Sequence, residues 1–115
     1  MVDDDAMIIA LMKKTLENMG FEVVTGSNGQ EALNLVKKYE FDLIILDQMM
    51  PKMDGIKACA LIKADRRFTN IPVVMFTASA QESDKKLSQQ VGANAFCNKP
   101  LNVAQLTQII QGLLK

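Results

Sequence analysis

Hydrophobic and polar positions follow two different spacings along this chain. In some stretches apolar residues recur every three or four positions, which is typical of a helix with one buried face. In others they form short continuous runs bounded by glycine, proline or polar residues, which is typical of buried strands. The helical spacing predicts helices within residues 6–19, 32–39, 56–65, 80–91 and 102–114.

The continuous apolar runs lie between these predicted helices. They are Phe21–Thr25, Phe41–Leu46, Pro72–Phe76 and Ala95–Cys97. Strands that alternate with helices indicate βαβ units and a parallel sheet. Because the runs at 43–46 and 73–76 are apolar at every position, both faces of the sheet are expected to be covered by helices. The pattern therefore predicts an α/β fold with a doubly wound parallel sheet.

The composition narrows the possible functions. The chain has 115 residues, a formal net charge of zero and a pI near 6.2, so residues 1–115 are expected to form one domain without the basic surface that nucleic acids require. No run approaches the roughly 20 apolar residues of a membrane span. There is no histidine, which excludes histidine-based catalysis within the chain. Cys59 and Cys97 are predicted to be free buried thiols, which fits a cytoplasmic protein.

Polar residues stand where the predicted strands end. Asp3 and Asp4 precede the first helix, and Asp47, Thr77 and Lys99 each follow an apolar run. Sites in doubly wound sheets lie outside the carboxyl ends of the strands. We therefore expect three carboxylates, a hydroxyl and an ammonium group to share one pocket.

This set of groups suits phosphoryl transfer. Clustered carboxylates repel one another, and Mg²⁺ relieves the repulsion because it prefers carboxylates, waters and phosphate oxygens. An ionised carboxylate can act as the nucleophile on phosphorus, while a lysine and a hydroxyl stabilise the equatorial oxygens. Each residue taken alone has a simpler explanation, as a helix start, a turn or a cap. Only their joint occurrence at successive strand ends indicates the chemistry.

The same residues carry a resemblance to a known family across nearly the whole chain. The Asp3–Asp4 pair opens a helix, and the segment 46–55 reads Leu-Asp-Gln-Met-Met-Pro-Lys-Met-Asp-Gly. Thr77-Ala78 and Lys99-Pro100 follow at later strand ends. In order and spacing the chain resembles the receiver (CheY-like) domain of two-component response regulators. The resemblance implies a flavodoxin-like sheet of five strands in the order 2-1-3-4-5.

The resemblance also implies a role for each residue of the predicted site. Asp47 is expected to be the phosphoacceptor, assisted by Thr77 and Lys99. The implied Mg²⁺ ligands are Asp3, Asp4, Asp47 and the backbone carbonyl of Met49. Thr77 and Phe96 take the family's switch positions, and the Lys99-Pro100 bond is expected to be cis.

The implied partners are a histidine kinase or phosphotransfer protein, and a downstream protein that reads residues 80–114. Phosphorylation of Asp47 would draw in Thr77 and Lys99, Phe96 would turn inward, and the helix at 80–91 would repack because it has few apolar anchors. The exposed residues expected on this output surface are Gln81, Glu82, Lys85, Lys86, Gln105 and Gln108. Neither nucleic acid nor membrane is an expected partner of this chain.

Two departures from the family pattern affect these expectations. Only Met1 and Val2 precede the acidic pair, so the first, central strand is expected to be shortened to a stub. An upstream natural start, trimming, or a partner chain that fills the gap would each account for it. Met49 offers no strong hydrogen-bonding group to hold an attacking water, so self-dephosphorylation is expected to be slow.

Two other functions compete with a phosphoacceptor receiver. A phosphatase of the haloacid-dehalogenase type also uses an aspartate nucleophile and Mg²⁺, but it requires a second aspartate at the position of Met49. A receiver-like module that binds without reacting is the other alternative, which the intact Asp4, Asp47, Thr77 and Lys99 argue against.

Overall fold

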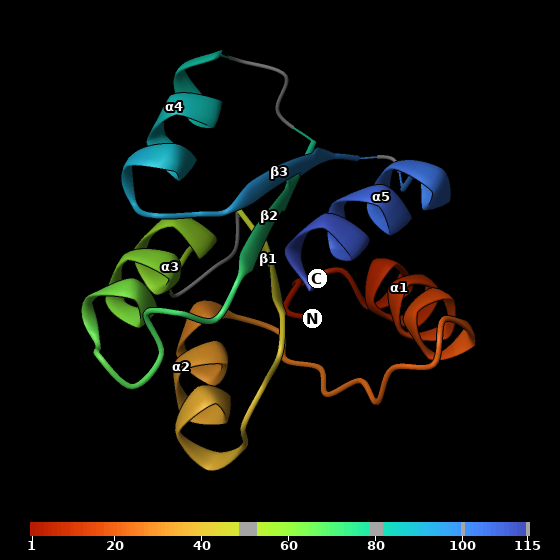
Figure 1. Ribbon diagram of the computed structural model, residues 1–115, viewed down its shortest axis with the longest axis horizontal. Helices are drawn as coiled ribbons and strands as arrows, with labels where there is room; N and C mark the ends of the chain where they lie inside the picture. Colours follow the sequence, from red (N-terminus) through yellow and green to blue (C-terminus); the bar gives the residue numbers. More distant parts are fainter. Residues whose placement is uncertain (49–52, 79–81, 100, 115) are drawn as a thin grey trace.

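The structure is a computed structural model that describes residues 1–48, 53–78, 82–99 and 101–114. Helices and strands alternate along most of the chain (Figure 1). The helices are α1 (Ala6–Asn18), α2 (Gly29–Lys38), α3 (Gly55–Ala64), α4 (Glu82–Gln90) and α5 (Val103–Leu113). The strands are β1 (Ile44–Asp47), β2 (Val73–Thr77) and β3 (Ala95–Asn98).

The strands form a parallel sheet in the order β1-β2-β3. Val2 extends this sheet by a single residue, because it forms parallel bridges to Leu46 on one side and to Gly26 on the other. Across the sheet, the segment at Gly26 comes first, followed by the segment at Val2, β1, β2 and β3. Numbered along the chain with Val2 as the first strand and Gly26 as the second, this is the predicted order 2-1-3-4-5. The predicted doubly wound fold is confirmed, and its first strand is indeed a stub.

The second predicted strand differs from the expectation. Residues 21–25 form no strand, and only Gly26 pairs with the stub. The physical reason is the shortness of its neighbour. A strand needs a partner for its N–H and C=O groups, and the Val2 segment bridges this part of the chain at Gly26 alone among the described residues. The Met1 amine donates to the carbonyl of Val24 at 3.0 Å, and burial lowers the pKa of this amine to about 6.

Helices cover both faces of the sheet, each over its own apolar cluster (Figure 1). Helices α2 and α3 pack on one face through Ala32, Val36, Ala58 and other residues around Ile44 and Leu46. Helices α1 and α5 pack on the other face around Ile45, Val74 and Phe76. Every residue of β1 and β2 is buried, as their unbroken apolar runs predict.

Helix α4 is held least firmly by apolar contacts. Its buried residue among those described is Ser88, whose hydroxyl donates to the carbonyl of Lys85, whereas Leu87 is 41% exposed. In Figure 1 it stands at one corner of the molecule, beyond α3. The expectation that α4 has the fewest apolar anchors agrees with this packing.

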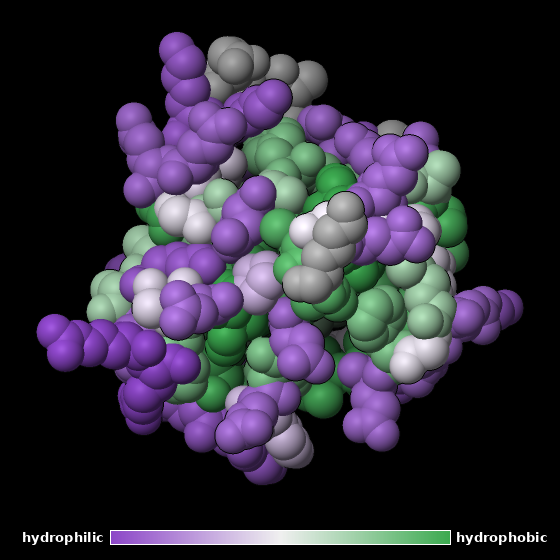
Figure 2. All heavy atoms as spheres, in the orientation of Figure 1, coloured by the Kyte–Doolittle hydropathy of each residue, from purple (hydrophilic) through white to green (hydrophobic). Residues whose placement is uncertain are grey.

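The remaining features concern the surface and the thiols. Cys59 and Cys97 are free and buried, as predicted. No helix in the described part of the chain is long and apolar enough to cross a membrane. Figure 2 shows hydrophilic side chains around the edge of one face and hydrophobic residues in its middle.

Candidate functional site

Three carboxylates meet at the carboxyl ends of the central strands. One oxygen from each of Asp3, Asp4 and Asp47 lies within 4.8 Å of the others. Asp3 and Asp47 are 1% and 3% exposed, while Asp4 faces solvent. Two buried carboxylates thus stand beside an exposed third, so a cation can reach the cluster from the Asp4 side.

The backbone fixes where these carboxylates lie. Val2 donates to the carbonyl of Ile45 and accepts from the N–H of Asp47, both at 2.8 Å. The chain leaves the sheet directly after this pairing, so Asp3 stands beside Asp47. The carboxylate of Asp3 then accepts from the N–H of Asp5 at 2.9 Å, which turns the chain toward α1.

Asp5 has a different role from the two aspartates before it. Its carboxylate accepts hydrogen bonds from the N–H groups of Met7 at 2.9 Å and Ile8 at 3.4 Å. It is therefore the N-cap of α1. Of the three consecutive aspartates Asp3, Asp4 and Asp5, the last therefore starts the helix, whereas the first two belong to the carboxylate cluster.

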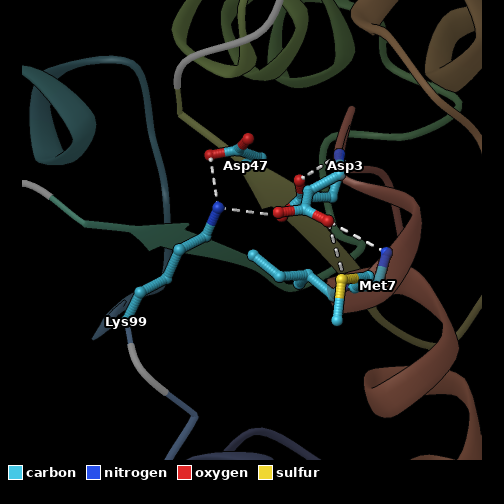
Figure 3. Close-up of polar contacts among 6 residues, drawn as sticks. Asp3, Met7, Asp47 and Lys99 are labelled. Carbon is cyan, nitrogen blue, oxygen red and sulfur yellow. Dashed lines mark hydrogen bonds and ion pairs between the residues drawn. The ribbon is translucent and has the colours of Figure 1, made fainter.

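Lys99 is the cation of this site (Figure 3). Its Nζ lies 3.0 Å from Oδ2 of Asp3 and 3.4 Å from Oδ1 of Asp47. The ammonium also lies 5.4 Å from the centre of the Phe76 ring. Burial alone would lower the pKa of Lys99, but the carboxylates of Asp3 and Asp47 outweigh it and raise the pKa. Lys99 therefore stays charged and neutralises part of the cluster.

Thr77 and Phe96 lie on the neighbouring strands β2 and β3. Thr77 ends β2, is 1% exposed, and accepts a hydrogen bond at its backbone carbonyl from the N–H of Lys99 at 2.7 Å. Phe96 pairs with Met75 in the sheet and is half-buried against the apolar cluster under α2 and α3. The two residues thus lie on adjacent strands, and their switch roles stay predictions.

Two predicted features, the backbone carbonyl of Met49 and the cis peptide bond before Pro100, lie outside the described residues. Gln81 of the predicted output surface lies outside them too. Of the other residues predicted for that surface, Lys85, Lys86, Gln105 and Gln108 are exposed.

Gly55 is a residue whose role in the site the sequence analysis missed. A Cβ atom at this position would lie 2.1 Å from the backbone oxygen of Asp47, so only glycine permits this approach. Its N–H donates to the carbonyl of Gln48 at 3.1 Å. The residue before it, Asp54, caps α3. The close approach to Asp47 comes from the tertiary fold and leaves no local signal.

Gln48 is the second residue of the site that the sequence analysis missed. It follows Asp47 and is 2% exposed. Its Oε1 has no hydrogen-bond partner among the described residues, a rare condition for a buried polar atom. The sequence indicated only that this position adjoins the predicted phosphoacceptor, and nothing in it distinguishes a buried glutamine from an exposed one.

The donor set fits Mg²⁺. Carboxylate oxygens are the ligands this ion prefers, with waters completing its shell. Oδ2 of Asp3 is buried and has its ion pair with Lys99 but no well-aligned hydrogen bond among the described residues. A buried carboxylate oxygen in this condition has capacity left for a cation.

Comparisons with known proteins agree with this geometry. The family model of the response regulator receiver domain matches residues 1–111. The chain is 35% identical over 114 residues to the alkaline phosphatase synthesis transcriptional regulatory protein PhoP of Bacillus subtilis, covering 99% of the chain and 47% of PhoP. The chain thus spans about half the length of the curated relatives it matches.

Solved structures of receiver domains are also similar to this chain. Chemotaxis protein CheY4 of Vibrio cholerae superposes with a TM-score of 0.92 at 33% identity, covering 98% of this chain and 94% of that one. The receiver domain of sensor histidine kinase PA1611 from Pseudomonas aeruginosa, solved with magnesium coordinated in its active-site cleft, gives 0.91 at 26% identity, covering 98% and 93%. The chain belongs to the response regulator receiver domain family, and the resemblance noted from its motifs is confirmed.

Proposed function

We propose that residues 1–115 act as a single phosphoacceptor receiver domain of a two-component phosphorelay, in which Asp47 takes a phosphoryl group from a phosphohistidine. One observation carries this proposal. The buried carboxylate of Asp47 lies within a cluster of three carboxylates and 3.4 Å from the Lys99 ammonium. A nucleophile, a candidate metal site and a cation for the phosphoryl oxygens therefore adjoin one another.

The transfer requires few protein groups. An Asp47 oxygen forms the new bond to phosphorus while the bond from phosphorus to the donor's imidazole nitrogen breaks. Lys99 is positioned to pair with a phosphoryl oxygen by a charge-assisted hydrogen bond. Asp3, Asp4 and Asp47 would hold Mg²⁺, which neutralises developing negative charge when bound. As signalling chemistry, the reaction modifies the chain itself and turns over no separate substrate.

The response to phosphorylation is proposed to run through β2 and β3. A phosphoryl group on Asp47 adds negative charge beside Thr77 and Lys99, whose backbones are already joined at 2.7 Å. Movement of the Thr77 hydroxyl toward that charge would leave room for Phe96. Helix α4 would then shift at low cost, because Leu87 is 41% exposed and the buried residue of the helix among those described is the polar Ser88.

The proposed partners follow from this response. A histidine kinase or phosphotransfer protein would bring its phosphohistidine to the open, Asp4 side of the cluster. A downstream partner would read residues 80–114, which include the exposed Lys85, Lys86, Gln105 and Gln108. The zero net charge gives this chain no general attraction to nucleic acid, and the phosphorelay would operate in the cytoplasm.

The direct test is phosphorylation by a small donor. The chain is incubated with acetyl phosphate, or with beryllofluoride as a phosphoryl mimic, with and without Mg²⁺, and its mass and amide NMR spectrum are recorded. A Mg²⁺-dependent adduct is expected in the parent chain and in Asp42→Asn, a control on the exposed surface, but not in Asp47→Asn. Equal labelling of Asp47→Asn would refute the assignment of the phosphoacceptor.

The same experiment separates the two competing functions. A phosphatase would release phosphate continuously from an external ester such as p-nitrophenyl phosphate and would accumulate no adduct. A module that only binds would give neither adduct nor turnover. The buried Asp47 and its contact with Lys99 favour the phosphoacceptor over both.

A further inference from the structure

Gln48 combines two properties that rarely occur together in a folded protein. Its side chain is 2% exposed, and its Oε1 accepts no hydrogen bond from the part of the chain that the structure describes. A buried amide oxygen without a donor has lost its hydration and gained no bond in exchange. Such a group destabilises the packing that encloses it, so it calls for an explanation in terms of what that packing does.

The backbone of Gln48 is held on both sides. Its N–H donates to the carbonyl of Phe76 at 3.2 Å, and its carbonyl accepts from the N–H of Gly55 at 3.1 Å. The first bond continues the pairing of β1 with β2, and the second joins the residue to the start of α3. A backbone shift that carried the amide out to water would break one of these bonds. The side chain is therefore kept where the sheet and α3 place it.

The sheet register brings Gln48 to the predicted switch residues. One step beyond the last paired residues of β1 and β2, Gln48 comes opposite Thr77. Side chains alternate between the two faces of a sheet. Leu46 lies in the apolar cluster under α2 and α3, and Gln48 stands two positions after it; Met75 and Thr77 are related in the same way. Because Phe96 packs against that cluster too, Gln48 lies on the face that carries both switch residues.

The reacting carboxylate belongs to the opposite face. Asp47 stands two positions after Ile45, which lies in the apolar cluster under α1 and α5, and its Oδ1 is 3.4 Å from the ammonium of Lys99 (Figure 3). The same alternation turns the amide of Gln48 away from this carboxylate. Gln48 is therefore not placed to contact a phosphoryl group on Asp47, and its influence on phosphorylation passes through Thr77.

We propose that Gln48 is a positioning residue of the switch. Its unpaired amide oxygen destabilises the unphosphorylated packing around Thr77, and so lowers the free energy needed to reach the phosphorylated packing. The inference rests on the proposed function of Asp47 as the phosphoacceptor, and it adds a residue that sets how readily the switch responds.

The proposed response to phosphorylation changes what surrounds this oxygen. The Thr77 hydroxyl turns toward the phosphoryl group, Phe96 enters the space that it leaves, and the enclosure of Gln48 is rebuilt. Oε1 then reaches a donor, which is water or a main-chain N–H of the repacked segment. The destabilisation falls on the unphosphorylated packing alone, so the two packings come closer in free energy and the second is more readily populated.

The variant that tests this role is Gln48→Met, which keeps the length of the side chain and removes its polar atoms. The midpoint of urea unfolding of the unphosphorylated chain should rise by at least about 0.5 M, because no buried oxygen is left unpaired. Beryllofluoride with Mg²⁺, titrated into the chain and followed by amide NMR, should bind at least about fivefold more weakly, because the switch that it drives has become costlier. The affinity for Mg²⁺ alone should be unchanged.

The two measurements separate a role in the switch from a purely structural one. If the substitution stabilised both packings equally, the urea midpoint would rise while the beryllofluoride affinity stayed that of the parent chain. If an ordered water satisfied Oε1 in the unphosphorylated chain, the midpoint would not rise. Either result would overturn the proposal.

Two further variants serve as controls. Gln48→Leu removes the amide with a different shape and should move both measurements in the same directions as Gln48→Met; opposite directions would mean that shape decides, and not the amide. Gln111→Met changes an exposed residue of α5 and should leave both unchanged. A parent chain that does not bind beryllofluoride would overturn the proposed function and this inference with it. A parent that binds it, with Gln48→Met binding equally well, would overturn the role of Gln48 alone.

Discussion

Replacing Lys99 by methionine should make the stability of this chain depend on Mg²⁺. The substitution keeps most of the side chain's length and removes its charge. It leaves the carboxylates of Asp3 and Asp47, which are 1% and 3% exposed, without their shared cation. Two buried carboxylates that repel one another favour unfolding, since unfolding returns both to water.

The distances set the size of the effect. With an effective dielectric constant near 20, charges at 3.0 Å and 3.4 Å attract by about 5 kcal/mol per pair. Desolvation of the ammonium offsets much of this, and breaking a buried pair typically costs 3–5 kcal/mol. Because the Lys99 side chain is 16% exposed and Asp4 opens the site to water, we expect a loss of about 2–4 kcal/mol.

Urea unfolding followed by circular dichroism measures this loss, once with EDTA and once with millimolar Mg²⁺. The variant should lose stability in EDTA and regain more than half of the loss with Mg²⁺, because the metal replaces the missing charge. Its Mg²⁺ affinity should rise at least about tenfold, since Lys99 no longer competes for the carboxylates. The control is Lys13→Met, an exposed charge removal on α1.

The outcome that would refute this reasoning is an equal loss with and without Mg²⁺. It would mean that the lysine stabilises the fold by packing its carbon chain, and that the carboxylates do not form one electrostatic unit. A loss in Lys13→Met of the same size would point instead to overall charge.

Further predictions concern residues around the site and in the core. Gly55→Ala should cost about 1–3 kcal/mol by overpacking and slow labelling of Asp47, because its Cβ would meet the Asp47 backbone oxygen; unchanged labelling would contradict this. Burial raises the pKa of Cys59 to about 11 from 9.0, so the unfolded state releases the proton first. The contribution of Cys59 to the free energy of unfolding should therefore be constant below pH 9 and fall between pH 9 and 11 by at most about 3 kcal/mol, a slope that Cys59→Ala removes. Asp5→Ala should cost about 1 kcal/mol in urea unfolding through loss of the α1 cap with Mg²⁺ affinity unchanged, whereas Asp4→Asn should weaken Mg²⁺ binding by more than about tenfold. The phosphorylated chain should lose its label slowly after the donor is removed, and a lifetime of seconds would contradict this.

The sequence predicted the parts of this molecule that depend on periodicity and on strand ends. The apolar runs of β1 and β2 are buried at every position, and Asp3, Asp4, Asp47 and Lys99 do meet at one rim. That convergence could be foreseen because parallel strands all end at the same edge of a sheet.

Other features depend on tertiary contacts that no local pattern records. The run at 21–25 has strand-forming residues, yet it lacks a partner and forms no strand. The close approach of Gly55 to the Asp47 backbone and the burial of Gln48 arise where α3 meets the end of β1. Propensity describes what a segment can form, whereas pairing and packing decide whether it forms.

The first-strand stub positions one side of the carboxylate cluster. Val2 is 3% exposed and holds Gly26 and Leu46 together, and Asp3 follows it directly in the chain. The position of Asp3 relative to Asp47 is therefore set by a single bridged residue, where a full strand would supply several. Any restraint on Val2 therefore also restrains Asp3. Restraint of a ligand before the cation arrives lowers the entropy lost on binding, and linkage makes the effect mutual. Mg²⁺ at the carboxylates and the bridges of Val2 to Gly26 and Leu46 should accordingly strengthen one another.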